Sequence, residues 1–382
     1  MKVGYYFWGH LGDKLTDETR DTPDGNAWYS SSIIQRLLLN GHDVYRMAPD
    51  LDYNEFKMFG AEIFNSFEPT KRLEAYNKMK NIRWDSPNKA DNLPKLDSLL
   101  LEWRFPILGR NLPTDQRRKN FHPDLLMQNT ILDFYKDQNT FLYIFDLDYK
   151  LTEEDEKRIN DMFPNRVLVL ETAYKPKTGI LRRQRVEIPF WVKNTILPMT
   201  QEPSEYKNLV YIGSRYERDD VIDKHIIPFS KKFPFTVWFH GNWKKYPDKY
   251  DELYETLKWR DIQYHDRVGH TDFRKVYGNA LACPLIGKQS YFDNGFMTAR
   301  IQEALYYGTI PIGFAEHLGI EEYLPEELIV SKDRSIEYVL DYLRAQPLDQ
   351  RDRLRQSIWK RLRFMDVSNF VDTMMDGVRH NV

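Results

Sequence analysis

Short apolar runs alternate with amphipathic stretches along this chain, and the alternation predicts strands that are each followed by a helix. At the N-terminus, residues 2–8 are apolar enough for a buried strand, Ala27 to Asn40 have helical spacing, and HDVYRMA supplies a second strand. Gly41 stands where that helix should end. Such a β-loop-α-β unit is the usual start of a doubly wound α/β domain with a parallel sheet.

The same alternation recurs in both halves of the chain and predicts two domains. Further strands are expected at LDSLLLEW, TFLYIFDLD, VLVLETA, NLVYIGS, FTVWFHGN, ALACPLIG and TIPIGF. Between residues 189 and 203, prolines and polar residues interrupt the pattern, as in an interdomain hinge. We therefore predict an α/β fold with two Rossmann-like, doubly wound domains that face a central cleft. Residues 1–195 form the first and 196–354 the second, and a last helix, 355–382, packs back on the first.

Composition excludes some classes of protein and leaves others open. The 382 residues are 41% hydrophobic, enough for a large core, and the formal net charge of −2 neither requires nor forbids a nucleic-acid partner. The single cysteine, Cys283, lies in an apolar run, which predicts a core position and excludes intramolecular disulfides and cysteine-based metal sites. Without a long apolar segment or a signal-peptide pattern, we expect a cytoplasmic protein with no membrane partner, and a monomer.

The stretch from Ser290 to Phe314 carries the strongest chemical signal. It reads as a helix that ends at a glycine and runs into a buried strand, with Arg300 and Glu303 one turn apart near the helix start. At the mouth of a parallel sheet, an arginine suits the diphosphate of a nucleotide and a carboxylate suits its ribose diol. The alternative is an i,i+3 ion pair on a solvated face.

Loops after the other strands of the second half add polar groups at the same edge. The first loop follows the strand NLVYI and contains a glycine, a serine and two arginines, which suit a diphosphate. The alternative is an ordinary tight turn with solvated arginines. The glycine of FHGN would let the backbone approach a base or ribose, and DRVGHTDF either offers backbone groups to uracil or only connects two elements. Asp293 is a candidate cap for the helix of Arg300. The nucleotide-binding candidates are Gly213, Ser214, Arg215, Arg218, Gly241, Val268, Thr271, Arg300 and Glu303.

One longer pattern links these residues to a known family. The pattern tyrosine-x-Asp-Asn-x-Phe-x-Thr-x-Arg-x-x-Glu is unbroken at Tyr291, Asp293, Asn294, Phe296, Thr298, Arg300 and Glu303. Residues 209–314 thereby resemble the donor domain of the T-even bacteriophage DNA β-glucosyltransferase family. The resemblance implies a GT-B fold and a UDP-sugar donor, with Arg215, Arg218 and Arg300 on the diphosphate and Glu303 on the ribose. It also implies Mg²⁺ or Mn²⁺ near the diphosphate, although no dedicated metal cage is legible, and the family's arginine loop is slightly longer.

The first half resembles the family more loosely and offers a general base. In the family a strand that ends in an aspartate, followed by a hydrophobic residue, a basic residue and leucine, supplies the base, and the run DYKL from Asp148 fits. One carboxylate that takes the proton of the accepting hydroxyl suffices for an inverting displacement. Asp146 competes for this role and His10 is a third candidate, while both acids could instead end a strand at the surface. Thr152 and Asp155 have the pattern of a capping box for the next helix.

Tyr29 departs from the family and leaves the sugar open. It stands where the family carries a glutamate that holds glucose hydroxyls. The sugar could therefore be glucose, another hexose or a pentose such as arabinose. The lead hypothesis is a bacteriophage enzyme, in the cytoplasm of the infected host, that transfers this sugar to 5-hydroxymethylcytosine in double-stranded DNA with inversion.

Basic clusters favour DNA as the acceptor, although solvated basic faces are common. One cluster comprises Lys175, Lys177, Arg182, Arg183, Arg185 and Lys193, and the other Arg104, Arg110, Arg117, Arg118 and Lys119. Phe105, Phe121 or Trp191 could fill the gap left by an extruded base.

Two other hypotheses keep the fold but change the function. The acceptor could be a surface polysaccharide or a lipid-linked sugar, for which the amphipathic segment Arg351 to Arg363 would be the membrane-docking helix. The chain could also be a nucleotide-binding module that has lost its base. Separate alanine substitutions of Asp146 and Asp148 discriminate, because a binding module is indifferent to both.

Overall fold

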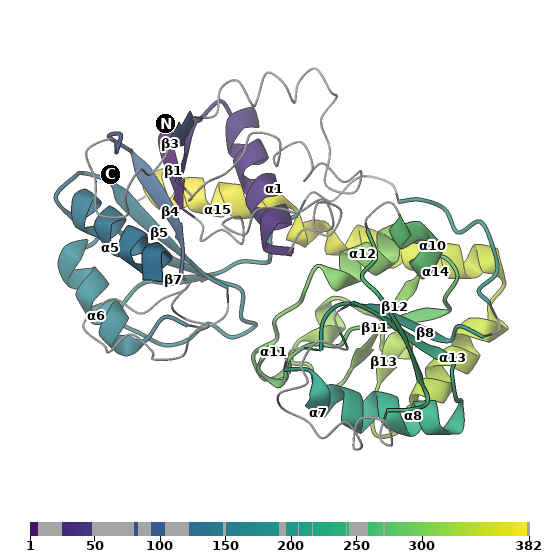
Figure 1. Cartoon of the computed structure of the whole chain (residues 1–382). Coiled ribbons are helices and arrows are strands. Elements are labelled where there is room, and N and C mark those ends of the chain that lie inside the picture. The colour runs from purple at the N-terminus through teal and green to yellow at the C-terminus, as the bar shows by residue number, and fades with distance from the viewer. Residues whose placement is uncertain are drawn as a thin grey trace. The chain divides into compact units, whose positions relative to one another are not determined.

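The computed structural model describes residues 1–6, 25–47, 80–82, 93–103, 122–147, 150–190, 196–204, 206–215, 217–241, 243, 259–269 and 272–379. The chain divides into two compact units, each with a parallel sheet between helices (Figure 1). Unit 1 comprises Met1–Thr16, Pro23–Val192 and Met365–Val382, and unit 2 comprises Asp17–Thr22 and Lys193–Phe364. The predicted α/β fold with two doubly wound sheets is confirmed.

The described sheet of unit 1 has seven parallel strands that progress outward in both directions from its middle. Their spatial order is β3 (Lys80–Ile82), β2 (Asp43–Met47), β1 (Lys2–Tyr6), β4 (Ser98–Glu102), β5 (Phe141–Asp146), β6 (Val167–Glu171) and β7 (Arg183–Arg185). The direction of progression reverses between β1 and β4. In open α/β sheets, ligands bind at the carboxyl ends of the strands beside such a reversal.

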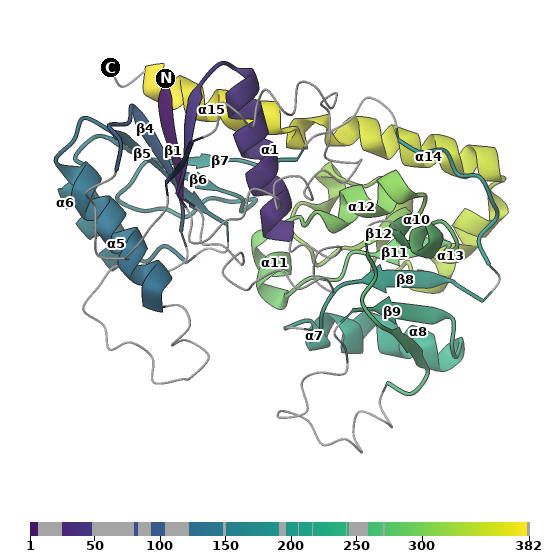
Figure 2. The same ribbon diagram turned by 45° about the horizontal axis from the view of Figure 1, so that its top comes forward.

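Helices cover both faces of this sheet (Figures 1 and 2). On one face lie α1 (Gly25–Leu39) and the C-terminal α15 (Val367–Arg379), where the ring of Phe145 meets that of Phe370 at 5.1 Å. On the other lie α5 (His122–Lys136) and α6 (Glu153–Met162), which pack on a core that includes Leu101 and Trp103. Both faces are covered, and β4 and β5 are accordingly buried at every position.

The sheet of unit 2 repeats this topology with six described parallel strands. Their order is β10 (Ile262–His265), β9 (Val237–His240), β8 (Leu209–Ile212), β11 (Ala282–Pro284), β12 (Ile310–Phe314) and β13 (Ile329–Val330). The reversal falls between β8 and β11. The carboxyl ends of these two strands are therefore the place where a nucleotide is expected.

The helices of unit 2 also form two layers (Figures 1 and 2). One layer holds α7 (Asp219–Val221), the π-helix η3 (Ile222–Ile226) and α8 (Ile227–Lys232). The other holds α10 (Phe273–Tyr277), α12 (Arg300–Tyr307) and α14 (Leu348–Arg361). The remaining elements are α11 (Gln289–Asn294), η6 (Ile320–Glu322), η7 (Glu326–Leu328), α13 (Ile336–Ala345) and η8 (Leu362–Met365).

The helix predicted from Ser290 is two helices, because the chain turns at Gly295. This residue adopts φ +69° as the left-handed C-cap of α11, and α12 begins only at Arg300. Asp293 lies inside α11, where its carboxylate accepts from the Gln289 amide at 2.8 Å, so the prediction that it caps the Arg300 helix is wrong. Two other local predictions are confirmed, because Thr152 forms the capping box of α6 and Cys283 is buried. The helix predicted over residues 355–382 is instead the end of α14 and a separate helix, α15 (Val367–Arg379).

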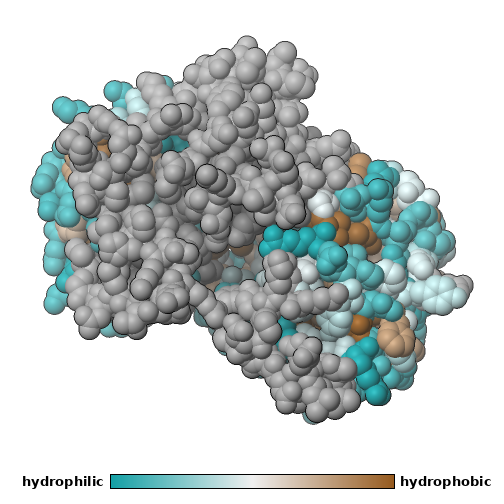
Figure 3. Space-filling model, in the orientation of Figure 1, coloured by the Kyte–Doolittle hydropathy of each residue, from teal (hydrophilic) through white to brown (hydrophobic). Residues whose placement is uncertain are grey.

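The amphipathic helix α14 buries its apolar side inside unit 2. The ring of Trp359 lies 6.2 Å from that of Tyr306 on α12, and the buried Arg355 donates to the carbonyl oxygen of Leu305, near the end of α12. On the side of unit 2 seen in Figure 3, the coloured residues are mostly hydrophilic, with small apolar patches. None of the helices that the structure describes combines the length and hydropathy that a membrane span requires.

Candidate functional site

The predicted nucleotide-binding residues of unit 2 gather around the carboxyl ends of its central strands. Gly213, Ser214 and Arg215 directly follow β8, Gly241 follows β9, and Val268 lies in the loop after β10. Arg218, Arg300 and Glu303 come from the segments that follow β8 and β11. Thr271 lies outside the described residues. The prediction had placed these groups at one edge of the sheet, and the described ones are there.

The loops after β8 and β9 touch through their backbones at two glycines. The Gly213 amide donates to the His240 carbonyl oxygen at 2.8 Å. Gly241 has φ +136°, and a Cβ added to it would lie 2.0 Å from the Gly213 carbonyl oxygen. Only glycine at position 241 allows the two loops to approach this closely.

Replacing Gly241 with alanine should destabilise unit 2, because the added methyl group meets backbone rather than a movable side chain. We expect a loss of at least about 2 kcal/mol, from the left-handed backbone and the overlap together. Gly41→Ala is the matched control, since Gly41 has φ +80° with nothing within 4 Å of its added Cβ, and should cost only about 1 kcal/mol. Calorimetric unfolding of both variants measures the difference, and equal losses would contradict a close approach.

Arg215 and Arg218 are both engaged inside their own loop. The Arg215 guanidinium binds Asp219 with two contacts of 3.0 Å and lies 4.1 Å from the centre of the Trp259 ring. Arg218 turns back onto Ser214, donating to its carbonyl oxygen at 2.9 Å and its hydroxyl at 3.2 Å. In this conformation the two arginines shape the loop, and a diphosphate would have to draw them away from these partners.

Arg300 and Glu303 form an ion pair, but not on a solvated face. The exposed fraction of the side chain is 18% for Arg300 and 5% for Glu303. The Tyr277 hydroxyl lies 3.3 Å from Arg300 and 3.4 Å from Glu303, and the Arg300 guanidinium lies 5.3 Å from the centre of the Tyr211 ring. Desolvation offsets much of the attraction in a buried ion pair, so we take this pair as the candidate nucleotide-binding site of unit 2.

Two further polar groups of this edge were missed by the sequence analysis. Lys288, in the loop after β11, forms an ion pair of 3.0 Å with Glu217 in the loop after β8. His240 ends β9 and stacks on His265 at 4.7 Å. Burial, helped by His265 and Lys207, lowers the pKa of His240 to about 4, so this imidazole is neutral at physiological pH. The signal for Lys288 was its place after a glycine at a strand end.

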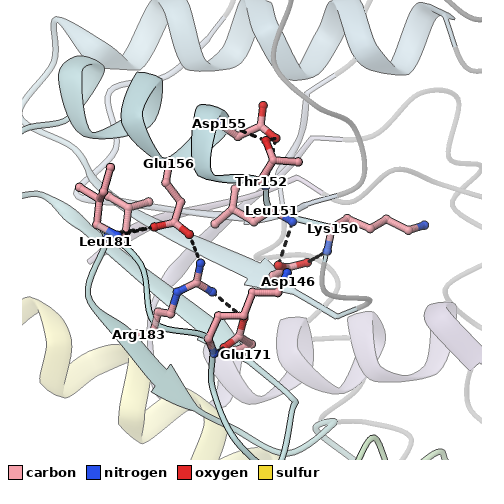
Figure 4. Close-up of polar contacts among 11 residues, drawn as sticks. Asp146, Lys150, Leu151, Thr152, Asp155, Glu156, Glu171, Leu181 and Arg183 are labelled. Atoms are coloured by element: carbon pink, nitrogen blue, oxygen red, sulfur yellow. Dashed lines mark hydrogen bonds and ion pairs between the residues drawn. The ribbon is translucent and has the colours of Figure 1, made fainter. Parts of the chain in front are cut away.

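In unit 1, Asp146 is fully buried at the carboxyl end of β5 (Figure 4). Its carboxylate accepts from the backbone amides of Lys150 at 2.7 Å and Leu151 at 3.0 Å. Burial raises the pKa of Asp146, while these hydrogen bonds and the charges of Lys177 and Arg183 oppose the rise. Asp146 thus fastens the chain where β5 leads into α6. Asp148 and His10 lie outside the described residues, as do Arg104 to Lys119, Phe121, Trp191 and Lys193.

Glu102, which ends β4 at the reversal point of unit 1, is the acid that the sequence analysis overlooked. The side chain is buried, and the Tyr29 hydroxyl of α1 donates to it at 2.7 Å. Tyr29 was noted only as the replacement of a glutamate. Nothing in the sequence indicated this role, because LDSLLLEW shows only an acid at the end of an apolar strand. It does not show that Tyr29 on α1 is the partner of this acid.

The described residues offer a divalent cation no cage of their own. Among them, no group of three or more histidine, cysteine, aspartate or glutamate side chains comes together. Mg²⁺ usually binds through one or two carboxylates and the phosphates of a substrate. An ion at this site would therefore take its ligands largely from a diphosphate.

Comparison with solved structures identifies the fold. A DNA-modifying β-glucosyltransferase matches with a TM-score of 0.56 at 12% identity, over 99% of both chains. The T4 phage enzyme in complex with UDP and Mn²⁺ matches at 12% identity and a TM-score of 0.54, also over 99% of both chains. The chain has the GT-B fold. No protein-family model matches the chain, and no curated protein does.

The GT-B likeness extends to proteins with other roles. AviGT4, a glycosyltransferase involved in avilamycin A biosynthesis, matches at 12% identity and a TM-score of 0.52, over 99% of this chain and 97% of its own. S. aureus TarM, solved with UDP, matches at 10% identity and a TM-score of 0.52 over 99% of both chains. The GT-B fold alone therefore does not select an acceptor.

Proposed function

We propose that the chain transfers a sugar from a UDP-sugar to the hydroxymethyl group of 5-hydroxymethylcytosine in double-stranded DNA, with inversion at the anomeric carbon. The buried ion pair of Arg300 and Glu303 at the reversal point of unit 2 carries the proposal. It lies within the only long motif of the chain that resembles the DNA β-glucosyltransferases, at the edge where doubly wound sheets hold nucleotides.

Unit 2 would hold the donor. The guanidinium of Arg300 would bind the diphosphate, and Glu303 would bind the ribose hydroxyls once the two side chains separate. Gly213 and Gly241 would present backbone groups to the nucleotide from the ends of β8 and β9. Ser214 and Arg218 would add hydrogen bonds to phosphate, and Val268 and Thr271 would border the uracil.

Unit 1 would hold the acceptor and the base. The carboxylate of Asp148 would remove the proton of the hydroxymethyl group while its oxygen attacks the anomeric carbon. The bond from that carbon to the phosphate oxygen breaks on the opposite face, and the electron pair leaves with UDP. One base is enough for this inverting step. Asp146, whose two oxygens already accept backbone amides, would position the segment that carries Asp148.

Two observations favour DNA over a membrane-bound acceptor. The segment between β6 and β7 exposes Lys175 and Arg182, which suit the phosphates of DNA. The candidate membrane-docking helix, in contrast, has its apolar side and two of its arginines buried within unit 2. Its amphipathic pattern is therefore explained by packing on α12.

The decisive experiment is mass spectrometry of nucleosides from DNA incubated with the protein and a panel of UDP-sugars. We expect 5-hydroxymethyl-2′-deoxycytidine, and not 2′-deoxycytidine from an unmodified control duplex, to gain the mass of one sugar with at least one donor. The panel includes UDP-glucose and a UDP-pentose, because Tyr29 leaves the sugar open. Transfer to a polysaccharide or a lipid-linked sugar, with none to DNA, would replace this proposal by the alternative acceptor.

A further inference from the structure

Two buried acids of unit 1, Glu156 and Glu171, hold the segment between β6 and β7 in place (Figure 4). Glu171, at the end of β6, accepts from the Lys177 amide at 2.9 Å. Glu156, on α6, accepts from the amides of Ile180 at 2.7 Å and Leu181 at 3.1 Å. The segment from residue 175 to 182, which we call the β6–β7 loop, is thus held by carboxylates rather than by a sheet or helix.

Arg183 joins these two acids. Its guanidinium lies 2.5 Å from Glu171 and also binds Glu156, and all three side chains are at most 5% exposed. Burial raises the pKa of Glu171, although Arg183 opposes this. Burying two carboxylates costs free energy that an apolar core would not cost. Hydrogen bonds from the loop amides and from Arg183 satisfy both carboxylates, and they hold the β6–β7 loop in one conformation.

The loop presents one apolar side chain to solvent. Ile180 is 59% exposed, while the next residue, Leu181, is buried in the core. Gly179 makes this possible, because a Cβ added there would lie 2.3 Å from the Glu156 carboxylate. The hydrogen bond from the Ile180 amide to Glu156 fixes the backbone there while the side chain of Ile180 stays exposed.

Basic residues flank Ile180 in the sequence. Lys175 and Arg182 are exposed, Lys177 is partly exposed, and no acidic residue occurs between residues 172 and 186. Several proteins that bend DNA insert an apolar side chain between base steps while basic side chains hold the phosphates. A rigid loop suits this task, since no ordering of the loop is needed on binding.

We infer that the β6–β7 loop is a DNA wedge: Lys175 and Arg182 contact the phosphates of duplex DNA, and Ile180 inserts at a base step. The inference rests on the DNA acceptor of the proposed function. It assigns to Ile180 the part that the sequence analysis gave to Phe105, Phe121 or Trp191. Insertion there would help to extrude the base that receives the sugar.

The test uses the full chain and a duplex with 2-aminopurine beside one 5-hydroxymethylcytosine, since 2-aminopurine fluorescence rises when the base unstacks. We expect Ile180→Ala to lower this rise about fivefold or more. Affinity for the duplex should change by less than about threefold, because phosphate contacts dominate it. Leu39→Ala is the matched control, as Leu39 is an aliphatic residue of unit 1 that is 47% exposed, and it should change neither.

The phosphate contacts have their own readout. Lys175→Ala and Arg182→Ala should each reduce the slope of log affinity against log salt by about 1. An unchanged slope in both variants, or a full fluorescence rise with Ile180→Ala, overturns the wedge. If Ile180→Ala loses binding to anionic vesicles and keeps the full fluorescence rise on DNA, the loop contacts a membrane instead and the wedge is wrong.

These results separate the wedge from the proposed function. If the wild-type protein transfers sugar to the duplex and Ile180→Ala gives the wild-type fluorescence, the wedge alone is wrong. If the fluorescence and salt slopes behave as expected but no sugar is transferred, the wedge stands and the proposed transfer is wrong.

Discussion

Replacing Asp148 with asparagine should lower kcat for sugar transfer to hydroxymethylated DNA by about 10²–10⁴-fold, the usual contribution of a general base. Asparagine has nearly the same shape but cannot take up the hydroxyl proton. The KM for the UDP-sugar should stay unchanged, because donor contacts are proposed in unit 2. Initial rates over a range of donor concentrations measure both quantities.

Asp146→Asn is the companion variant, and we expect a different outcome. Asparagine offers one acceptor oxygen where Asp146 uses two, so the amide of Lys150 or Leu151 loses its partner. Stability should fall by about 1–3 kcal/mol, and kcat should fall less than in Asp148→Asn. If instead Asp146→Asn abolishes turnover and Asp148→Asn is active, Asp146 is the base.

The pH dependence of stability gives Asp146 a second readout. Burial raises the pKa of this carboxyl above that of the unfolded chain, so protonation favours the folded state. The protonated carboxyl of Asp146 therefore contributes its full stabilisation at a pH below its pKa in the unfolded chain. This contribution is lost as the pH rises through the pKa of Asp146 in the folded protein. Asparagine does not titrate. The stability of the wild type relative to Asp146→Asn should thus increase as pH falls through this window, as measured by denaturant unfolding.

The fold was predictable from the sequence because its strands are short, apolar and regularly separated. Buried parallel strands such as β5 and β12 are apolar at almost every position, and a glycine directly follows β8 and β9. The boundary at Gly295 was not predictable to the same degree. A glycine is compatible both with a helix interior and with a left-handed cap, and only the packing of α11 and α12 decides between them.

The candidate site was predictable where one segment carries it, and not where partners come from distant segments. Arg300 and Glu303 are three residues apart, so their pairing could be weighed in advance, although their burial could not. Glu102 binds a tyrosine 73 residues away, and Arg183 joins Glu156 to Glu171 across two elements. Such contacts depend on the register of strands and helices, which a single sequence does not specify.

Glu303→Gln should weaken UDP binding by about tenfold or more, and it tests the donor site more directly than any loss of turnover. Glutamine keeps the size of the side chain but accepts hydrogen bonds less strongly than a carboxylate. Arg300→Ala should weaken UDP binding further, by about 30-fold or more, because a desolvated partner of the diphosphate is lost. Calorimetric titration with UDP gives both affinities without an acceptor.

A structural role of the pair would produce similar losses, and two controls exclude it. Arg353→Ala removes an exposed arginine of unit 2 that pairs only with its helix neighbour among the described contacts, and it should leave UDP affinity unchanged. The second control is 2′-deoxy-UDP. If Glu303 binds the ribose hydroxyls, Glu303→Gln should cost less affinity for 2′-deoxy-UDP than for UDP, since part of the interaction is already missing. Equal losses for the two ligands would mean that Glu303 only supports Arg300, and the ribose assignment would then be wrong.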